Sequence, residues 1–190
     1  MEKLNLYKIR DLAIKSGRAV FSVQQLANLI GKPKSVAKVY ASRMAKKGLA
    51  KRLLRGKISF VEDDFVIAAQ LLEPSYISLN SALLFHNIMK QVPAMIECVA
   101  PGNSRRYGGL GIVYHKIPSR LFFGYKKYRK AGSYIFVAEP EKALLDGIYL
   151  NMFKKEMVKE LMEKMDGKKL AEYAAAWKGR GAKKMRGMVL

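Results

Sequence analysis

Apolar residues recur every three or four positions through the first fifty residues, which is the spacing of amphipathic helices. The first such run, 4–13, ends at Ser16-Gly17, because glycine favours the residue that follows a helix. A short apolar segment, 19–21, comes next and has the character of a strand. The pattern predicts one helix followed directly by one strand.

Two further helices are predicted, joined by a short turn. Ser22 is placed to cap the first of them, 23–30, with Gln25 as its capping-box partner. A turn containing Gly and Pro, 31–34, separates it from the second, 35–47, whose first residue is a serine expected to cap it. Two helices around a turn of about four residues have the spacing of a helix-turn-helix.

A basic β-hairpin is predicted directly after these helices. Segment 49–60 contains two strand-like runs around Arg55-Gly56-Lys57, where the glycine supplies the turn. A hairpin in this position is typical of the wing of a winged helix-turn-helix, so the N-terminal part is predicted to be one.

The helix over 35–47 has a distinct inner and outer face. Ala37, Tyr40, Ala41 and Met44 share one side and are predicted to be buried. The outer face is predicted to contact DNA. Together with Lys34 at the start of the helix, it comprises Ser35, Lys38, Val39, Ser42, Arg43 and Lys46.

The outward residue types suit DNA recognition. Arg43 suits a bidentate contact to guanine, and Val39 suits a thymine methyl group, while Ser and Lys near the helix start suit phosphates or bases. On the hairpin, the residues expected to reach the flanking backbone or minor groove are Arg52, Arg55 and Lys57. The basic face of an isolated helix is often only exposed to solvent. Here, however, the turn before the helix and the hairpin after it favour DNA binding.

Charge strengthens this interpretation. The 190 residues contain 36 Lys and Arg against 15 Asp and Glu, a formal net charge of +21. Between Leu12 and Val61 there are twelve Lys or Arg residues and no Asp or Glu. A surface with charge of one sign usually faces phosphate, which makes double-stranded DNA the expected partner. Double-stranded RNA, another protein and an anionic membrane surface are the competing partners.

An acidic segment, 62–64, ends the basic region and is expected to begin a helix that stops before Pro74. We predict two domains from this boundary. Residues 1–73 are the winged helix-turn-helix DNA-binding domain, and residues 74–190 form an α+β domain with C-terminal helices and a basic tail.

The second part alternates strand and helix patterns, so the predicted fold class is α+β. Strands are expected at 76–77, 94–100, 110–116, 121–124 and 134–138. Helices are expected from Ser78, from Pro140, over 158–165 and over 170–177. The tail after residue 177, with five Lys or Arg, is either a phosphate-binding segment or a solvated terminus.

Several classes of protein do not fit this sequence. No apolar run reaches the roughly 18 residues of a membrane span, and the N-terminus has no signal-peptide pattern, so a cytoplasmic protein is expected. Cys98 lies in an apolar run and is expected to be a buried thiol. Because Cys98, His86 and His115 are far apart without ligand spacing, we predict no metal and no cofactor.

Further basic residues of the second part are interleaved with tyrosines, a composition that suits single-stranded nucleic acid. Alternatively, the tyrosines pack under strands while the charges lie in loops. The residues concerned are Arg105, Arg106, Lys126, Lys127, Arg129 and Lys130 with Tyr107, Tyr125 and Tyr128.

Four stretches resemble the AbiEi-type antitoxins of prokaryotic toxin–antitoxin and abortive-infection systems. They are YISLNSALLFHN (76–87), VPAMIECVAP (92–101), FFGYKKY (122–128) and AEPEKALLDGIYL (138–150). With the N-terminal winged helix the resemblance covers about residues 5–150, and its most specific piece is the EPEKALLD segment, 139–146.

The resemblance implies two roles. In that family the N-terminal domain represses its own operon by binding inverted repeats in the promoter, and two molecules on one repeated site are therefore expected. The C-terminal domain counteracts a nucleotidyltransferase-like toxin without forming a stable complex with it. Carried over, repression falls on the outer face of 35–46 and on the hairpin, and toxin control falls on 75–190.

Two alternatives stay open. One is a nucleic-acid-processing enzyme that docks through the winged helix, with His115, or Glu141 with Asp146, as acid–base groups. It is weaker because the sequence shows no catalytic motif, and we predict a protein without enzymatic activity. The other is an antitoxin that neutralises an acidic toxin by direct protein binding.

Overall fold

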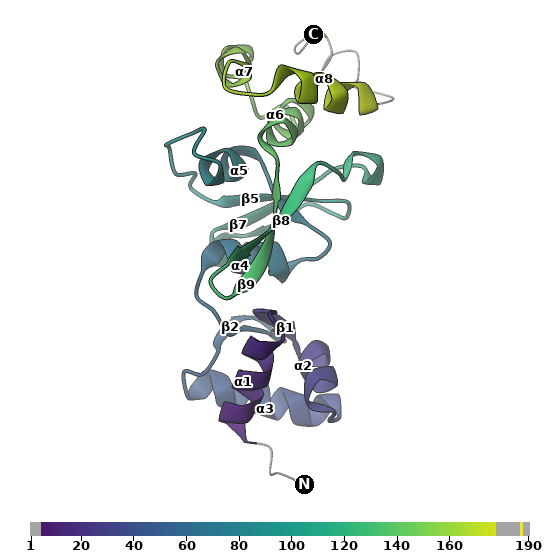
Figure 1. Cartoon of the computed structure of the whole chain (residues 1–190). Coiled ribbons are helices and arrows are strands. Elements are labelled where there is room, and N and C mark those ends of the chain that lie inside the picture. Colours follow the sequence, from purple (N-terminus) through teal and green to yellow (C-terminus); the bar gives the residue numbers. More distant parts are fainter. Residues whose placement is uncertain (1–4, 178–186, 188–190) are drawn as a thin grey trace. The chain divides into compact units, whose positions relative to one another are not determined.

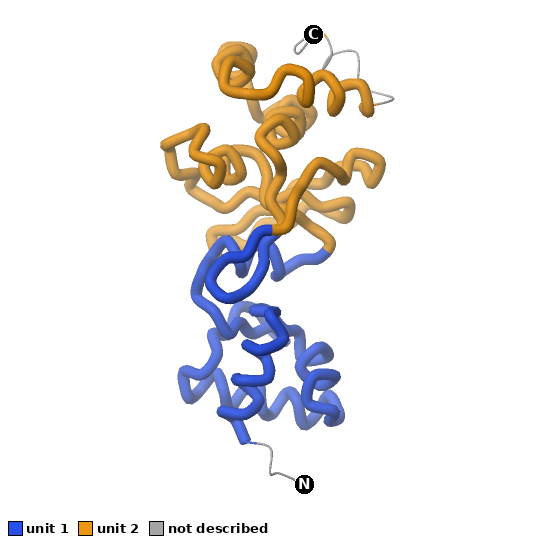
Figure 2. The backbone as a smooth tube through the Cα atoms, viewed as in Figure 1, with its two compact units in different colours: residues 1–73, 128–135 blue, residues 74–127, 136–190 orange. Residues whose placement is uncertain are grey.

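The computed structural model of this chain describes residues 5–177 and residue 187 (Figure 1). The chain divides into two compact units, residues 1–73 with 128–135 and residues 74–127 with 136–190 (Figure 2). It combines helices with two sheets, so the predicted α+β class is confirmed. Segment 128–135, which we placed in the second domain, belongs to the first unit.

Three of the four helices that the structure describes in the first unit begin at side-chain caps. The four are α1 (Leu6–Lys15), α2 (Val23–Ile30), α3 (Lys34–Lys46) and α4 (Asp64–Leu71). Ser22 and Gln25 form the predicted capping box of α2, and Gly31 ends that helix in the left-handed conformation at φ 61°. The Asp63 side chain caps α4 by accepting a hydrogen bond from the Val66 amide.

Helix α3 begins one residue earlier than predicted. Pro33 is its N-terminal flanking residue, and no side chain caps the helix. The proposed cap at Ser35 is therefore wrong, because Ser35 already lies inside the first turn. Pro33 has the fixed φ that suits a helix start, which explains how the turn leads into α3 without a hydroxyl cap.

A three-stranded antiparallel sheet completes this unit. Its strands, in spatial order, are β1 (Val20–Ser22), β3 (Lys57–Ser59) and β2 (Lys51–Leu54). The strands β2 and β3 form the predicted hairpin, with Gly56 at φ 78° in its turn. The register puts Phe21 opposite Ile58, so both side chains enter the core.

One apolar cluster holds the helices against this sheet. Ala37, Ala41 and Met44 of α3 are buried as predicted, while Tyr40 is half-buried at the edge of the cluster. Small residues on the inner face of α3 let this helix pack closely on α2. The close packing fixes the direction in which the outer face of α3 points.

The second unit contains most of a six-stranded mixed sheet, of which residues 128–130 of β8 and 133–135 of β9 belong to the first unit. In spatial order its strands are β6 (Arg105–Tyr107), β7 (Ile112–Lys116), β5 (Ile96–Ala100), β4 (Tyr76–Ile77), β9 (Ser133–Ala138) and β8 (Tyr125–Lys130). The pairs β5–β7 and β4–β9 are parallel, and β4–β5 and β6–β7 are antiparallel.

This sheet differs from the prediction at three segments. Segment 121–124 is not a strand: a short 3-10 helix, Ser119–Leu121, leads into irregular chain. Strands β6 and β8 were not predicted. Both are edge strands with exposed basic residues, so they lack the continuous apolar run that marks the central strands.

The helices of the second unit are α5 (Leu79–Phe85), α6 (Pro140–Tyr149), α7 (Lys155–Met162) and α8 (Gly167–Ala176). Helix α6 packs against α5, α7 and α8 (Figure 1). Gly167 is the first residue of α8, and Asp166 caps that helix. Throughout 5–177, no helix combines the length and apolar character needed to cross a membrane.

Candidate nucleic-acid interface

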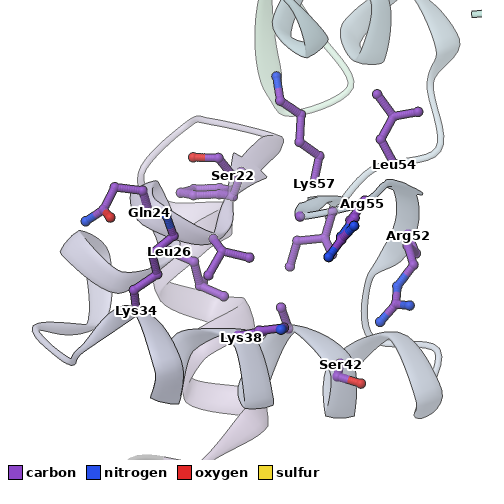
Figure 3. A pocket seen from close by; sticks show the side chains of 15 residues that line it. Ser22, Gln24, Leu26, Lys34, Lys38, Ser42, Arg52, Leu54, Arg55 and Lys57 are labelled. Atoms are coloured by element: carbon purple, nitrogen blue, oxygen red, sulfur yellow. The ribbon is translucent and has the colours of Figure 1, made fainter.

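A groove of about 700 Å³ lies between α3 and the β2–β3 hairpin (Figure 3). Fifteen residues line it; five are Lys or Arg, and none is Asp or Glu. The basic residues are Lys34, Lys38, Arg52, Arg55 and Lys57. A concave surface lined by one sign of charge concentrates its electrostatic field, so this groove attracts anions.

Helix α3 forms one wall. Lys34, Lys38 and Ser42 line the groove from successive turns, because residues four apart share a helix face. Ser42 is half-buried, whereas both lysines are exposed. The helix has 13 residues and is therefore about 20 Å long, and a helix of ordinary diameter fits the major groove of B-DNA.

The hairpin forms the opposite wall. Arg52 lies on β2 and Arg55 in the turn, and Figure 3 shows both side chains directed towards the side on which α3 lies. The turn is fastened to α2 because the Val23 amide donates a 3.0 Å hydrogen bond to the Gly56 carbonyl oxygen. This bond fixes the turn that carries Arg55 relative to α2.

Lys57 departs from the prediction. Its side chain lies at the groove wall, but its ammonium group donates a hydrogen bond to the backbone carbonyl oxygen of Leu71. Figure 3 shows the side chain extending away from α3. The geometry of Lys57 therefore does not support the predicted DNA contact. Its ammonium group, which was expected to contact phosphate, is bonded to the end of α4 instead.

The other predicted contacts lie outside the groove. Ser35, Val39, Arg43 and Lys46 are exposed on α3, and Val39 has 48% of its surface accessible. They continue the outer face of the helix beyond the lysines that line the groove. The structure therefore divides the predicted α3 set into a groove-lining group and an exposed ridge.

Sequence reasoning missed the contribution of α2. The start of this helix, Ser22 to Gln24, lines the same groove, and Gln24 is exposed there. A helix N-terminus adds positive potential, which favours phosphate. The signal was present in the capping box, which marks where a helix begins, but the pattern did not show that this end faces the hairpin.

The proposed acid–base groups are not assembled into one site. Asp146 is fully buried; it accepts hydrogen bonds from Tyr76 and Ser78 and forms an ion pair with Lys142. Glu141 is buried on the same helix, and its Oε1 accepts a bond from the Asp166 amide. His115 lies on β7. Neither carboxylate is exposed to a substrate.

The basic residues of the second part are divided between two strands. Arg105 and Arg106 lie on β6 and the others on β8, and these strands are at opposite ends of the sheet order. Tyr125 stacks on Tyr76 with ring centroids 4.6 Å apart. Packing of this tyrosine within the protein fits our alternative explanation for the interleaved pattern.

The remaining predictions concern Cys98, metal ligands and the basic tail. Cys98 is fully buried as expected, and burial raises the pKa of its thiol well above the ordinary value. Within the part of the chain that the structure describes, no three His, Cys, Asp or Glu side chains are grouped as metal ligands. The basic tail, 178–190, lies outside the described residues except for residue 187.

Comparison of the chain with models of known protein families finds no match, and comparison with curated proteins finds none either. The resemblance to AbiEi-type antitoxins therefore rests on the quoted stretches alone. Its most specific segment, 139–146, forms the start of α6, where its charged side chains are buried.

Proposed function

We propose that this protein is a DNA-binding transcription regulator whose first unit is a winged helix-turn-helix. Helix α3 is the recognition helix, and the β2–β3 hairpin is the wing. The observation that carries the proposal is the groove between them, which brings Lys34, Lys38, Arg52 and Arg55 together without a single acidic side chain. Double-stranded DNA is the polyanion that fits a basic helix beside a basic hairpin.

Different parts of the surface take different roles in this proposal. The exposed ridge of α3 enters the major groove, where Arg43 pairs with guanine and Val39 contacts a thymine methyl group. Lys34, Lys38, Arg52 and Arg55 contact the phosphate backbone and set the position of the helix. The expected site is an inverted repeat that two molecules occupy.

The biological role that we propose is that of an antitoxin. It represses its own operon and counteracts a nucleotidyltransferase-like toxin in the cytoplasm, without forming a stable complex with it. The resemblance of 76–150 to AbiEi-type antitoxins supports this role. Because its most specific residues are buried in α6, they support a shared fold of the second unit more directly than a shared contact surface.

Fluorescence anisotropy with DNA from upstream of the protein's own gene tests the first role. We expect Lys38→Ala/Arg43→Ala/Lys46→Ala to weaken binding by at least about a hundredfold, because each lost contact contributes roughly 1–3 kcal/mol. The matched control is Lys154→Ala/Lys155→Ala/Lys159→Ala, which removes the same charge from exposed positions near or within α7. Equal losses in the two triple variants would contradict the assignment of α3.

The antitoxin role has its own test. Co-expression with the product of an adjacent toxin gene is expected to restore growth, and the α3 triple variant is expected to keep this protection while losing repression. Failure of the unaltered protein to protect cells from that toxin would contradict the antitoxin role and leave DNA binding unaffected.

A further inference from the structure

A second cavity, of about 530 Å³, lies wholly within the second unit. Its floor is the face of the sheet formed by β5, β7 and β6. Methionines from the chain before β5 and from the start of the α7 region form its sides. This volume falls in the range of small-molecule sites in proteins.

The strand register places charged groups of opposite sign on this floor. Val113 of β7 pairs with Glu97 on one side and with Arg106 on the other, so the three side chains share one face of the sheet. His115 lies two residues along β7 on the same face. Glu97 and Arg106 are two strands apart, a separation of about 10 Å between their backbones.

These charges do not neutralise each other. Among the described residues, neither Glu97 nor Arg106 forms an ion pair, although both line the same cavity. Burial raises the pKa of Glu97, while hydrogen bonds from the backbone and side chain of Asn80 favour its charged form. The Asn80 backbone amide donates to Oε2 at 3.0 Å, and the carboxylate has further lone pairs available. Arg106 is exposed, whereas Glu97 is only 8% exposed at the base.

His115 adds a third polar group. Its Nε2 atom is buried and has no hydrogen-bond partner within the part of the chain that the structure describes. Burial lowers the pKa of His115, so the imidazole is neutral near pH 7 and either donates or accepts according to its tautomer. A buried nitrogen without a partner is costly unless a ligand or water satisfies it.

The apolar lining has a particular character. Met89, Met95, Met152 and Met157 line the cavity, which therefore gathers four of the ten methionines of the chain. Thioethers make favourable contacts with aromatic rings and adapt to ligands of different outline. A flat aromatic ring can therefore pack against the methionines. The neighbouring polar groups can form hydrogen bonds with the edge of that ring.

We propose that this cavity binds a free mononucleotide whose base carries an amino group. The base lies against the methionines, its amino group donates to the Glu97 carboxylate, and its phosphate binds the Arg106 guanidinium at the mouth. The separation of Glu97 and Arg106 across two strands suits a ligand with a hydrogen-bonding edge at one end and an anion at the other. A purine nucleotide has both, with a ring broad enough to cover several thioethers.

The base preference follows from the carboxylate. Adenine, guanine and cytosine present amino hydrogens, whereas the N3–H of uracil is flanked by two carbonyl oxygens that repel a carboxylate. We therefore expect AMP or GMP to bind at least roughly tenfold more tightly than UMP, a difference of about 1.4 kcal/mol. This site is independent of the DNA-binding proposal, because all of its residues belong to the second unit.

Isothermal titration calorimetry of the full chain with AMP, GMP, CMP and UMP tests the proposal. We expect Arg106→Ala to weaken binding of the preferred nucleotide at least about tenfold. The control is Arg105→Ala, which removes the same charge from the neighbouring residue of β6, whose side chain points to the opposite face. Equal effects of the two variants, or no binding of any nucleotide by the unaltered chain, would overturn the site.

A second comparison separates the phosphate contact from a general loss of charge. The corresponding nucleoside is expected to bind the unaltered protein and the Arg106→Ala variant with similar affinity, because it has no phosphate to lose. Glu97→Gln is expected to remove the discrimination against UMP, with circular dichroism confirming that the variant is folded. Persistence of that discrimination, or binding of single-stranded oligonucleotides but not of mononucleotides, would contradict the proposal.

Discussion

The side-chain amide of Gln70 donates a 2.9 Å hydrogen bond to the hydroxyl oxygen of Ser133, although 63 residues separate them in the chain. Gln70 also donates to the Tyr134 carbonyl oxygen and accepts from the amides of Ala19 and Val20. Its side chain is 1% exposed, and both ends of the amide are satisfied. One residue of α4 therefore ties strand β1 to the segment 128–135.

We expect Gln70→Met to destabilise the protein by at least about 2 kcal/mol, because the buried backbone amides of Ala19 and Val20, at the start of β1, lose their acceptor. Urea unfolding of the full chain measures this. The control is Gln24→Met on the exposed side of α2, where Gln24 bonds only to Asn28 among the hydrogen bonds of its side chain. A change below about 0.5 kcal/mol is expected there.

Local sequence signals predicted the elements of the first unit well, because caps, glycines and the spacing of apolar residues act within a few positions. The Ser22–Gln25 capping box and the Gly56 turn are examples. The bond from Gln70 to Ser133 was beyond this reasoning. It depends on the segment 128–135, which is distant in sequence, and a glutamine inside an apolar helix does not reveal its partners.

The candidate site shows the same limit. Helical spacing predicted which side of α3 faces outward, and Lys38 and Ser42 lie as expected. It did not reveal that Lys57 turns to the Leu71 carbonyl group, because the position of α4 beside the hairpin is set by packing. Strand β8 was missed because an edge strand needs only one apolar face.

Lys57 therefore gives a prediction that separates stability from binding. We expect Lys57→Met to destabilise the fold by about 1 kcal/mol through loss of the bond to Leu71, with little change in DNA affinity. Arg55→Ala is expected to weaken DNA binding several-fold without comparable loss of stability, since Arg55 is exposed in the turn. Anisotropy and urea unfolding on both variants measure the two effects; the reverse pattern would contradict the geometry.

Removing Lys142 is expected to destabilise the protein by about 3–5 kcal/mol. Lys142 and Asp146 form a fully buried ion pair, and the ammonium group lies 5.2 Å from the Phe123 ring centroid. Lys142→Met leaves the Asp146 charge buried without its counter-ion. The exposed pair of Lys164 and Glu160 has the same spacing, and Lys164→Met is expected to leave stability nearly unchanged. Thermal unfolding of both variants provides the comparison.

Gly147 reverses the usual effect of glycine in a helix. Alanine normally stabilises a helix interior by about 1 kcal/mol relative to glycine. At Gly147 in α6, however, a Cβ atom would overlap the ring of Phe153. We expect Gly147→Ala to destabilise the protein by about 1–3 kcal/mol in urea unfolding. Gly167→Ala, where no atom lies within 4 Å of the added carbon, is expected to be neutral or stabilising.

Glu139 is expected to make the free energy of unfolding depend on pH. Burial alone would raise the pKa of this carboxyl group, but hydrogen bonds from Lys126, Lys169 and Tyr173 outweigh it and lower the pKa to about 2. Because this pKa is lower than the unfolded value of about 4.3, the carboxylate stabilises the fold above that pH, and the effect is lost as the pH falls towards 2.

The comparison is with Glu139→Gln, which lacks this titration. At neutral pH we expect the variant to be less stable by about 2 kcal/mol. The difference is expected to shrink as the pH is lowered from about 4.3 towards 2, when the native carboxylate takes up its proton. Urea unfolding at a series of pH values measures it. A difference that stays constant across this range would show that Glu139 is not held as the charged form.

The first unit is assembled from two stretches of chain, and the backbone passes between the units at residues 73/74, 127/128 and 135/136. A gene fragment ending at residue 73 would encode α1 to α4 but would leave the Gln70 amide without Ser133 and Tyr134. Such a module cannot be transferred to another protein by a single crossover. Its inheritance is therefore coupled to that of the α+β unit, because residues 128–135 of the first unit lie within the stretch of sequence that encodes the second.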